Sequence, residues 1–90
     1  MSTEGLVGGW TEFRPLTAED QQVFDQALGG LIGVKYTPLE VAVQIVVGTN
    51  YKFRCNALPQ VPNPVAFKVI IGIFRDLQDH VILTDIHKEK

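Results

Sequence analysis

The sequence lacks most of the features that would identify an enzyme, a metal protein or a disulfide-stapled secreted domain. It has a single cysteine, Cys55, so neither an intramolecular disulfide nor a cluster of thiolate metal ligands can form. Its two histidines, His80 and His87, both lie near the carboxyl end, without the spacing of a nucleophile–histidine–carboxylate site. We therefore expect no enzymatic activity, no metal site and no cofactor, and we interpret Cys55 as a packed strand residue.

Charge of one sign and long apolar runs are missing as well. The net charge is −2 at pH 7, which gives no electrostatic reason to bind nucleic acid or an anionic membrane. The apolar runs fall far short of the roughly 20 residues that a membrane span needs. No charged segment leads into an apolar one at the amino end, and with the lone cysteine this predicts a cytoplasmic protein. Secretion after removal of a signal peptide stays open.

What the sequence does contain is the composition of one small globular domain over residues 1–90. Hydrophobic residues make up 46% and charged residues 20% of the chain, which is ordinary for a protein with a packed core. Residues 1–12 are rich in glycine and have no periodic apolar pattern, so they indicate an extended, flexible arm.

A helical pattern follows the arm. Thr17 is a good N-cap, and Asp20 stands three residues later, where the acid of a capping box belongs. Gly33 suits a C-terminal cap, and two glycines shortly before it weaken the last turn. Apolar residues recur at helical spacing on one face and predict an amphipathic helix over residues 17–33. They are Val23, Phe24, Ala27, Leu28, Leu31 and Ile32.

After Pro38 the apolar period changes from helical to alternating, which predicts an antiparallel sheet over residues 38–87. The proline-rich segment 58–64 separates a first hairpin from a third strand at 65–74, and a fourth strand follows at 81–86. We predict an α+β fold in which four strands wrap one helix, and the arm could add a strand. The residues expected to face the helix are Leu39, Val41, Val43, Ile45, Tyr51, Phe53, Cys55 and Ala57.

The hairpins of such a meander end at the same edge of the sheet. The first turn is expected at Gly48, Thr49 and Asn50, and the second at 75–80. The arm can reach this edge too. Three segments with exposed apolar residues would then lie together: LVGG at 6–9, QIVVG at 44–48 and FRDLQ at 74–78. Exposed apolar loops on one edge indicate a contact surface.

These residues resemble the cystatin superfamily, and most closely its disulfide-free group, the stefins. QIVVG fits the pattern Gln-x-Val-x-Gly at the first hairpin, after one helix and downstream of a glycine arm. The order of arm, helix, hairpin, proline loop and hairpin covers nearly the whole chain.

The resemblance implies a reversible, competitive inhibitor of papain-like cysteine proteases, which plugs the active-site cleft with the arm and the two hairpins. On this resemblance Leu6 and Val7 fill substrate subsites, and the glycines supply thin backbone for a narrow cleft. We expect Gly48→Glu to weaken inhibition by orders of magnitude while leaving the fold intact. The residues expected to contact the protease are Leu6, Val7, Gly8, Gly9, Gln44, Ile45, Val46, Val47, Gly48, Leu77 and Gln78.

Some features depart from the family pattern and keep alternatives open. The second loop has Leu77-Gln78 where many members have Pro-Trp or Leu-Pro. Trp10 is expected to pack near the start of the helix, with an exposed anchor as the alternative. Gln44 can equally belong to the solvent face of a strand. A non-inhibitory cystatin-fold binding or scaffold module, natural or engineered, is the alternative function. We expect a monomer that can convert to a domain-swapped dimer through the first hairpin.

Overall fold

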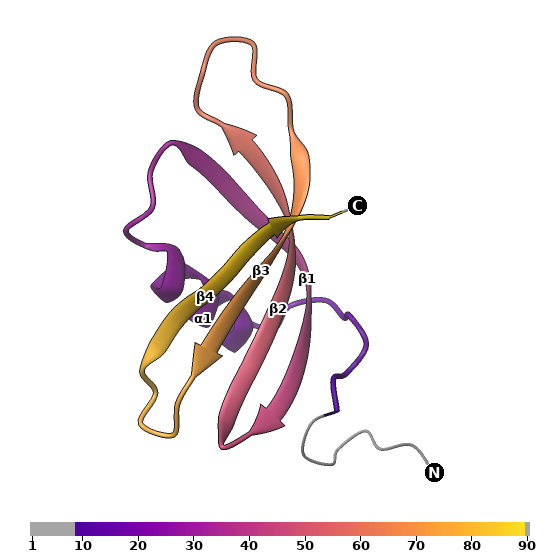
Figure 1. The fold of residues 1–90 in the computed structure, drawn as a ribbon, viewed down its shortest axis with the longest axis vertical. Helices are drawn as coiled ribbons and strands as arrows, with labels where there is room; N and C mark the ends of the chain where they lie inside the picture. Colours follow the sequence, from indigo (N-terminus) through magenta and orange to yellow (C-terminus); the bar gives the residue numbers. More distant parts are fainter. Residues whose placement is uncertain (1–8, 90) are drawn as a thin grey trace.

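One helix lies across one face of a four-stranded antiparallel sheet (Figure 1). The computed structural model describes residues 9–89. The strands pair in the order β1-β2-β3-β4, so the predicted α+β fold is confirmed. The elements are α1 (Ala18–Leu28), β1 (Val34–Val46), β2 (Gly48–Pro59), β3 (Phe67–Arg75) and β4 (Val81–Lys88).

The start of α1 follows the sequence, but its end does not. The Thr17 hydroxyl accepts a hydrogen bond from the Asp20 amide at 3.2 Å, and the Asp20 carboxylate accepts one from the Thr17 amide at 2.9 Å. This capping box satisfies amides that the first helical turn leaves free. The helix ends at Leu28 rather than at residue 33, because a Gly-Gly pair follows and glycine disfavours continued helix. Ile32, predicted on the apolar stripe, is therefore 94% exposed.

The predicted roles of Leu31 and Gly33 at the end of the helix are also corrected. Leu31 is also exposed, and its amide bonds the Leu28 carbonyl in the turn that closes the helix. Gly33 does adopt positive φ, at +94°, but it lies just before β1 and does not cap α1.

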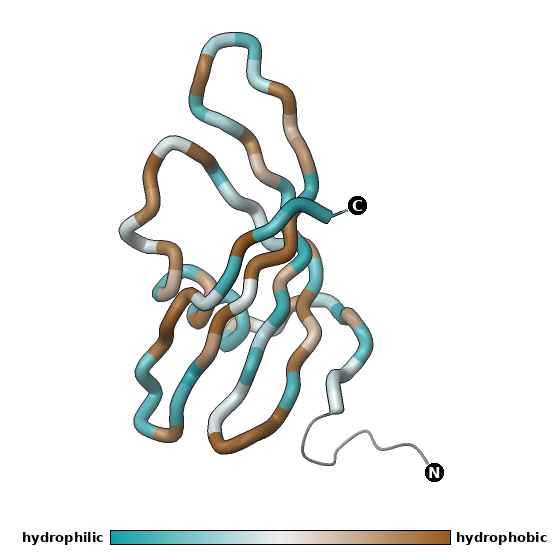
Figure 2. Tube along the Cα trace, viewed as in Figure 1, coloured by the Kyte–Doolittle hydropathy of each residue, from teal (hydrophilic) through white to brown (hydrophobic). Residues whose placement is uncertain are grey.

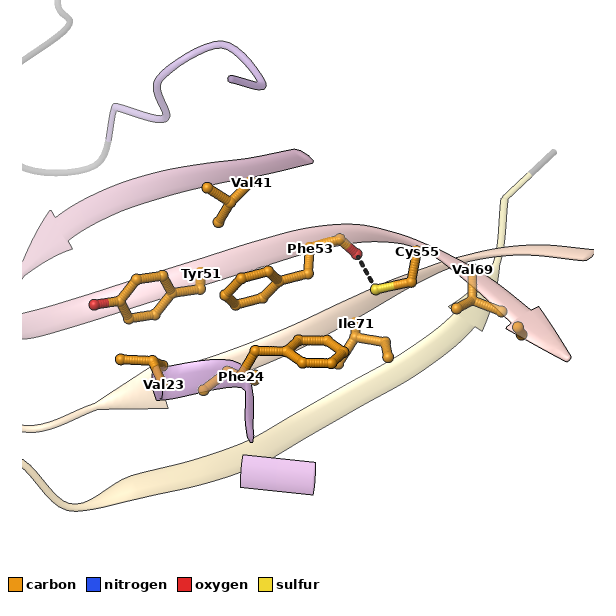
Figure 3. Close-up of a cluster of buried hydrophobic side chains, with 10 residues drawn as sticks. Val23, Phe24, Val41, Tyr51, Phe53, Cys55, Val69 and Ile71 are labelled. Atoms are coloured by element: carbon orange, nitrogen blue, oxygen red, sulfur yellow. Dashed lines mark hydrogen bonds between the residues drawn. The ribbon is translucent and has the colours of Figure 1, made fainter. Parts of the chain in front are cut away.

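The core lies between α1 and the sheet (Figure 3). Val23 and Phe24 of α1 are buried, and the Phe24 ring meets the Phe53 ring edge-on with centroids 5.0 Å apart. The predicted alternation of the second strand is confirmed, because its four helix-facing residues are all buried: Tyr51, Phe53, Cys55 and Ala57. Burial raises the pKa of the Cys55 thiol to about 12, so little thiolate is available for chemistry at neutral pH.

A β-bulge in β1 breaks the alternation that the sequence predicts. Pro38 pairs with Cys55 and Glu40 with Arg54, so Leu39 is an extra residue on this strand. The bulge turns Leu39 outward, and the prediction that it faces the helix is wrong. Because of this extra residue, Tyr36 before the bulge and Val43 after it both pack against the core.

The strand bounds also differ from the predicted 38–87. The sheet begins at Val34 and ends at Lys88, and β3 begins at Phe67 rather than at residue 65. A second irregularity lies between β3 and β4, where Gly72 pairs with Asp85 and Ile73 with Leu83. Thr84 is therefore the extra residue of a bulge in β4.

The segment before the helix runs along the free edge of β1. Isolated bridges join Trp10 to Gln44 and Arg14 to Val41, both antiparallel, and the Thr11 amide donates to the Val43 carbonyl at 2.8 Å. The prediction of a flexible arm over residues 1–12 is therefore wrong for Trp10 and Thr11, which pair with β1.

The prediction from the sequence that Trp10 packs near the start of the helix is also wrong. The Lys52 ammonium stands 4.1 Å from the centre of its ring. Trp10, Lys52 and Gly72 line one groove, on the sheet face opposite α1.

In the part of the chain that the structure describes, no helix combines the length and apolarity needed to cross a membrane.

Candidate functional site

The turns of the two hairpins lie side by side at one end of the sheet (Figure 1). Thr49, at the start of β2, pairs with Arg75, the last residue of β3. Trp10 pairs with Gln44 and Arg14 with Val41, so from Arg14 back to Trp10 the chain approaches the same end. Gly9 is the first described residue of that path. The predicted contact residues Leu6, Val7 and Gly8 lie outside the described residues.

The tip of the first hairpin is made of hydrophobic residues (Figure 2). Val47 is 80% exposed and Ile45 is 56% exposed, although burial in a core is the usual fate of such residues. The last register pair of the hairpin is Val46 with Gly48, so Val47 alone separates β1 from β2. The turn predicted at residues 48–50 is therefore displaced, since all three of these residues already belong to β2. Gly48 has φ at +107°, a left-handed conformation that favours glycine in tight hairpin connections.

Gly48 has a second reason to be glycine, which the sequence does not show. It is buried against the neighbouring hairpin, and a Cβ there would lie 2.6 Å from the Arg75 carbonyl oxygen and 2.8 Å from the Phe74 ring. Glycine at this position thus permits the two hairpins to pack against each other. The expectation that Gly48→Glu leaves the fold intact is contradicted by this contact.

Gln44 lies in β1 near the tip, and its side chain is hydrogen-bonded to Asn50 of β2. The side-chain nitrogen Nδ2 of Asn50 donates to the side-chain oxygen Oε1 of Gln44 at 2.8 Å. Gln44 and Asn50 are register partners, and such cross-strand pairs stabilise a hairpin. Part of the role of Gln44 is therefore to stabilise the hairpin.

The second hairpin turn, residues 76–80, is organised around one carboxylate. Asp76 Oδ1 accepts hydrogen bonds from the Gln78 amide at 2.8 Å and the His80 amide at 2.9 Å. Its Oδ2 lies 2.9 Å from His80 Nδ1. Leu77 is 69% exposed at the tip of this turn, and Gln78 is exposed beside it.

These contacts also set the electrostatics of the turn. The hydrogen bond from the His80 amide, with those from the His80 ring and the Gln78 amide, lowers the pKa of Asp76. The neighbouring Arg75 guanidinium bonds Glu19 of α1 at 2.8 Å, which links the base of this turn to the helix. Asp76 and Arg75 were not singled out as site residues from the sequence. For Asp76 a signal existed, because aspartate often bonds the backbone two residues on in turns.

The tips of the two hairpins expose both aliphatic and polar side chains. The large aliphatic ones are Ile45, Val47 and Leu77, and polar residues such as Gln78 lie beside them. The lone thiol, Cys55, is buried in the core. Within residues 9–89, no group of three or more His, Cys, Asp or Glu residues is placed to hold a metal ion.

Comparison with known proteins gives one informative likeness. No model of a known protein family matches the sequence, and no curated protein matches it. Among solved structures, the chain is similar to the salivary cystatin of the soft tick Ornithodoros moubata. The superposition covers 94% of this chain and 100% of that one, with a TM-score of 0.68 and 21% sequence identity. The chain therefore has the fold of a cystatin.

Proposed function

We propose that the protein is a reversible inhibitor of papain-like cysteine proteases and a member of the cystatin superfamily. One observation carries the proposal: on a cystatin fold, the two hairpins present exposed aliphatic side chains at one end of the sheet, Val47 on one and Leu77 on the other. Isolated exposed apolar residues are common, but a group of them on adjacent turns is typical of a binding surface.

The physical basis of inhibition is the loss of water from preformed tips. Fully burying a side chain such as Val47 or Leu77 contributes roughly 1.5–3 kcal/mol. The first turn is braced by Gly48 against β3, and the second by Asp76. Little conformational freedom is lost when preordered turns dock, so more of the burial energy appears as affinity.

The amino-terminal arm would supply the third contact. Gly9 stands immediately before the bridge of Trp10 to Gln44, so the arm starts beside the first hairpin. Leu6 and Val7 would fill substrate subsites, with Gly8 and Gly9 allowing close backbone approach. No bond to the protease nucleophile forms in this arrangement, so inhibition is competitive and reversible.

Membership of the disulfide-free stefin type and a cytoplasmic location belong to the same proposal. The single cysteine is fully buried, and a protein without disulfides suits a reducing compartment. The alternative, a cystatin-fold binding module without inhibitory activity, is favoured by one observation: the Gln44 oxygen is already bonded to Asn50.

Titration of papain with the purified protein separates the two functions. We expect stoichiometric, competitive inhibition that is reversed on dilution, and binding to papain whose active-site cysteine has been alkylated. The second measurement matters because a plug needs no reaction with the nucleophile. Full papain activity at micromolar protein would reject inhibition and favour the binding module.

A further inference from the structure

We infer that Asp76 is a positioning residue that fixes the second hairpin turn and thereby presents Leu77 to the protease. The inference rests on the proposed function, because it names how one contact of that site is held. It assigns a role to a side chain that does not itself reach the tip.

The hydrogen bonds of the turn converge on Asp76. Its carboxylate accepts from the amides of Gln78 and His80, and it pairs with the His80 ring. Its own amide donates to the His80 carbonyl at 2.9 Å, and its carbonyl accepts from the Asp79 amide at 3.1 Å. The turn also holds Asp79 at φ +68°, a conformation that non-glycine residues adopt only when their surroundings favour it.

Leu77 has little else to hold it. Its side chain is 69% exposed, and it does not belong to the core cluster or to the residues packed against that cluster. Its direction therefore depends on the backbone of the turn, and the backbone depends on Asp76. Without the carboxylate, the turn must be ordered when the complex forms, which weakens binding.

The experiment compares Asp76→Ala, Leu77→Ala and the double variant by their inhibition constants for papain. We expect each single variant to raise the inhibition constant about tenfold, and the double variant to raise it no further than Leu77→Ala alone. Asp76→Asn keeps an oxygen for the two amides, so it should recover most of the affinity. Asp85→Ala is the matched control, since Asp85 pairs with His87 in the middle of β4, and it should leave inhibition unchanged.

Amide hydrogen exchange in the free protein supplies a readout that does not depend on inhibition. The amides of Gln78 and His80 should lose protection in Asp76→Ala and keep it in Leu77→Ala, while core amides stay protected in both. Additive effects of the two substitutions, or an unchanged inhibition constant in Asp76→Ala, would overturn the inference and leave the proposed function standing. Absence of inhibition by the unaltered protein would overturn both.

Discussion

The α-carbon of Gly48 lies against the carbonyl oxygen of Arg75, so that a Cβ at Gly48 would stand 2.6 Å from that oxygen. The oxygen is backbone and cannot swing away as a side chain could. The contact joins the turn of one hairpin to the last residue of the neighbouring strand. The positions of the two tips are consequently coupled, and under the proposed function a protease cleft would meet them as one surface.

Gly48→Ala should therefore destabilise the fold. Left-handed backbone costs a non-glycine residue roughly 1–2 kcal/mol, and overpacking adds about 1–3 kcal/mol. We expect the free energy of unfolding to fall by about 2–4 kcal/mol in urea titrations. Gly30→Ala is the control, because no atom lies within 4 Å of its Cβ position, and it should cost little. Equal stability of the two variants would refute the contact.

Val47→Asp tests the tip without disturbing the core. Val47 is 80% exposed, so its replacement should change stability by no more than about 0.5 kcal/mol. Loss of its burial in a complex should raise the inhibition constant about ten- to a hundredfold. Ile32→Asp, 94% exposed in the connection after α1, is the matched control and should inhibit normally. If both variants inhibit equally, the tip is not the contact surface.

Two deletions separate the arm from the segment that pairs with β1. Removing residues 1–9 leaves the Trp10 and Thr11 contacts intact, so stability should change by less than about 1 kcal/mol. The inhibition constant should nevertheless rise about ten- to a thousandfold, mainly through faster dissociation.

Removing residues 1–12 should in addition lower the free energy of unfolding by about 1–3 kcal/mol. This deletion takes away the Thr11 hydrogen bonds to β1 and the contact of Trp10 with Lys52. Denaturant titrations and dissociation rates of both proteins give the comparison. Unchanged inhibition after the shorter deletion would show that the arm makes no contact.

Asp20 should make stability depend on acid pH. Burial alone would raise its pKa, but hydrogen bonds from Arg14 and Thr17 outweigh burial and lower the pKa below the ordinary 3.8. Its ionised form therefore favours the folded state. This contribution is complete above the unfolded value and disappears as the pH falls through the lower folded value.

Asp20→Asn should thus cost about 1–3 kcal/mol at neutral pH and progressively less below about pH 4. Unfolding free energies measured from pH 2 to 7 give the two curves, which should converge in acid. Asp25→Asn, on the exposed side of the same helix, controls for the lost charge. Parallel curves for Asp20→Asn and the unaltered protein would contradict the role of this carboxylate.

The first turn should act as the hinge of a domain-swapped dimer. Straightening Val46 to Gly48 would let α1 and β1 pack on β2 to β4 of a second molecule, with nearly all other contacts kept. We expect conversion near the unfolding temperature, detected by size-exclusion chromatography, and loss of inhibition because the tip is gone. Val47→Asn, a better turn residue than valine, should slow the conversion. A fully inhibitory heated dimer would place the hinge elsewhere.

The sequence predicted those parts of the fold that depend on local patterns. Thr17 and Asp20 indicated the helix start, and alternation from Tyr51 to Ala57 indicated the buried face of the second strand. The bulge at Leu39 was not predicted, because from Leu39 onward apolar residues stand at every second position and indicate a regular strand; before the bulge, Val34 and Tyr36 stand in the opposite phase. Which residue is extra depends on the pairing of β1 with β2, and a single strand does not reveal that pairing.

The candidate site divides in the same way. The exposed tip could be predicted from the position of QIVVG and from the meander, because both are local or topological. The contact of Gly48 with Phe74 and Arg75 could not, since it joins residues far apart in the chain. The hydrogen bonds of Asp76 within its turn could have been predicted from the residue type, whereas the apolar pattern of the sequence indicated only Leu77.

The bulges at Leu39 and Thr84 occupy the two outermost strands of the sheet. A regular outer strand is a template on which further chains can add and grow into fibrils, and bulges interrupt that template. On β1, Pro38 adds a position without an amide donor. Intact molecules should therefore not stack strand to strand into ordered aggregates. Concentrated solutions should accordingly stay clear as long as the protein remains folded.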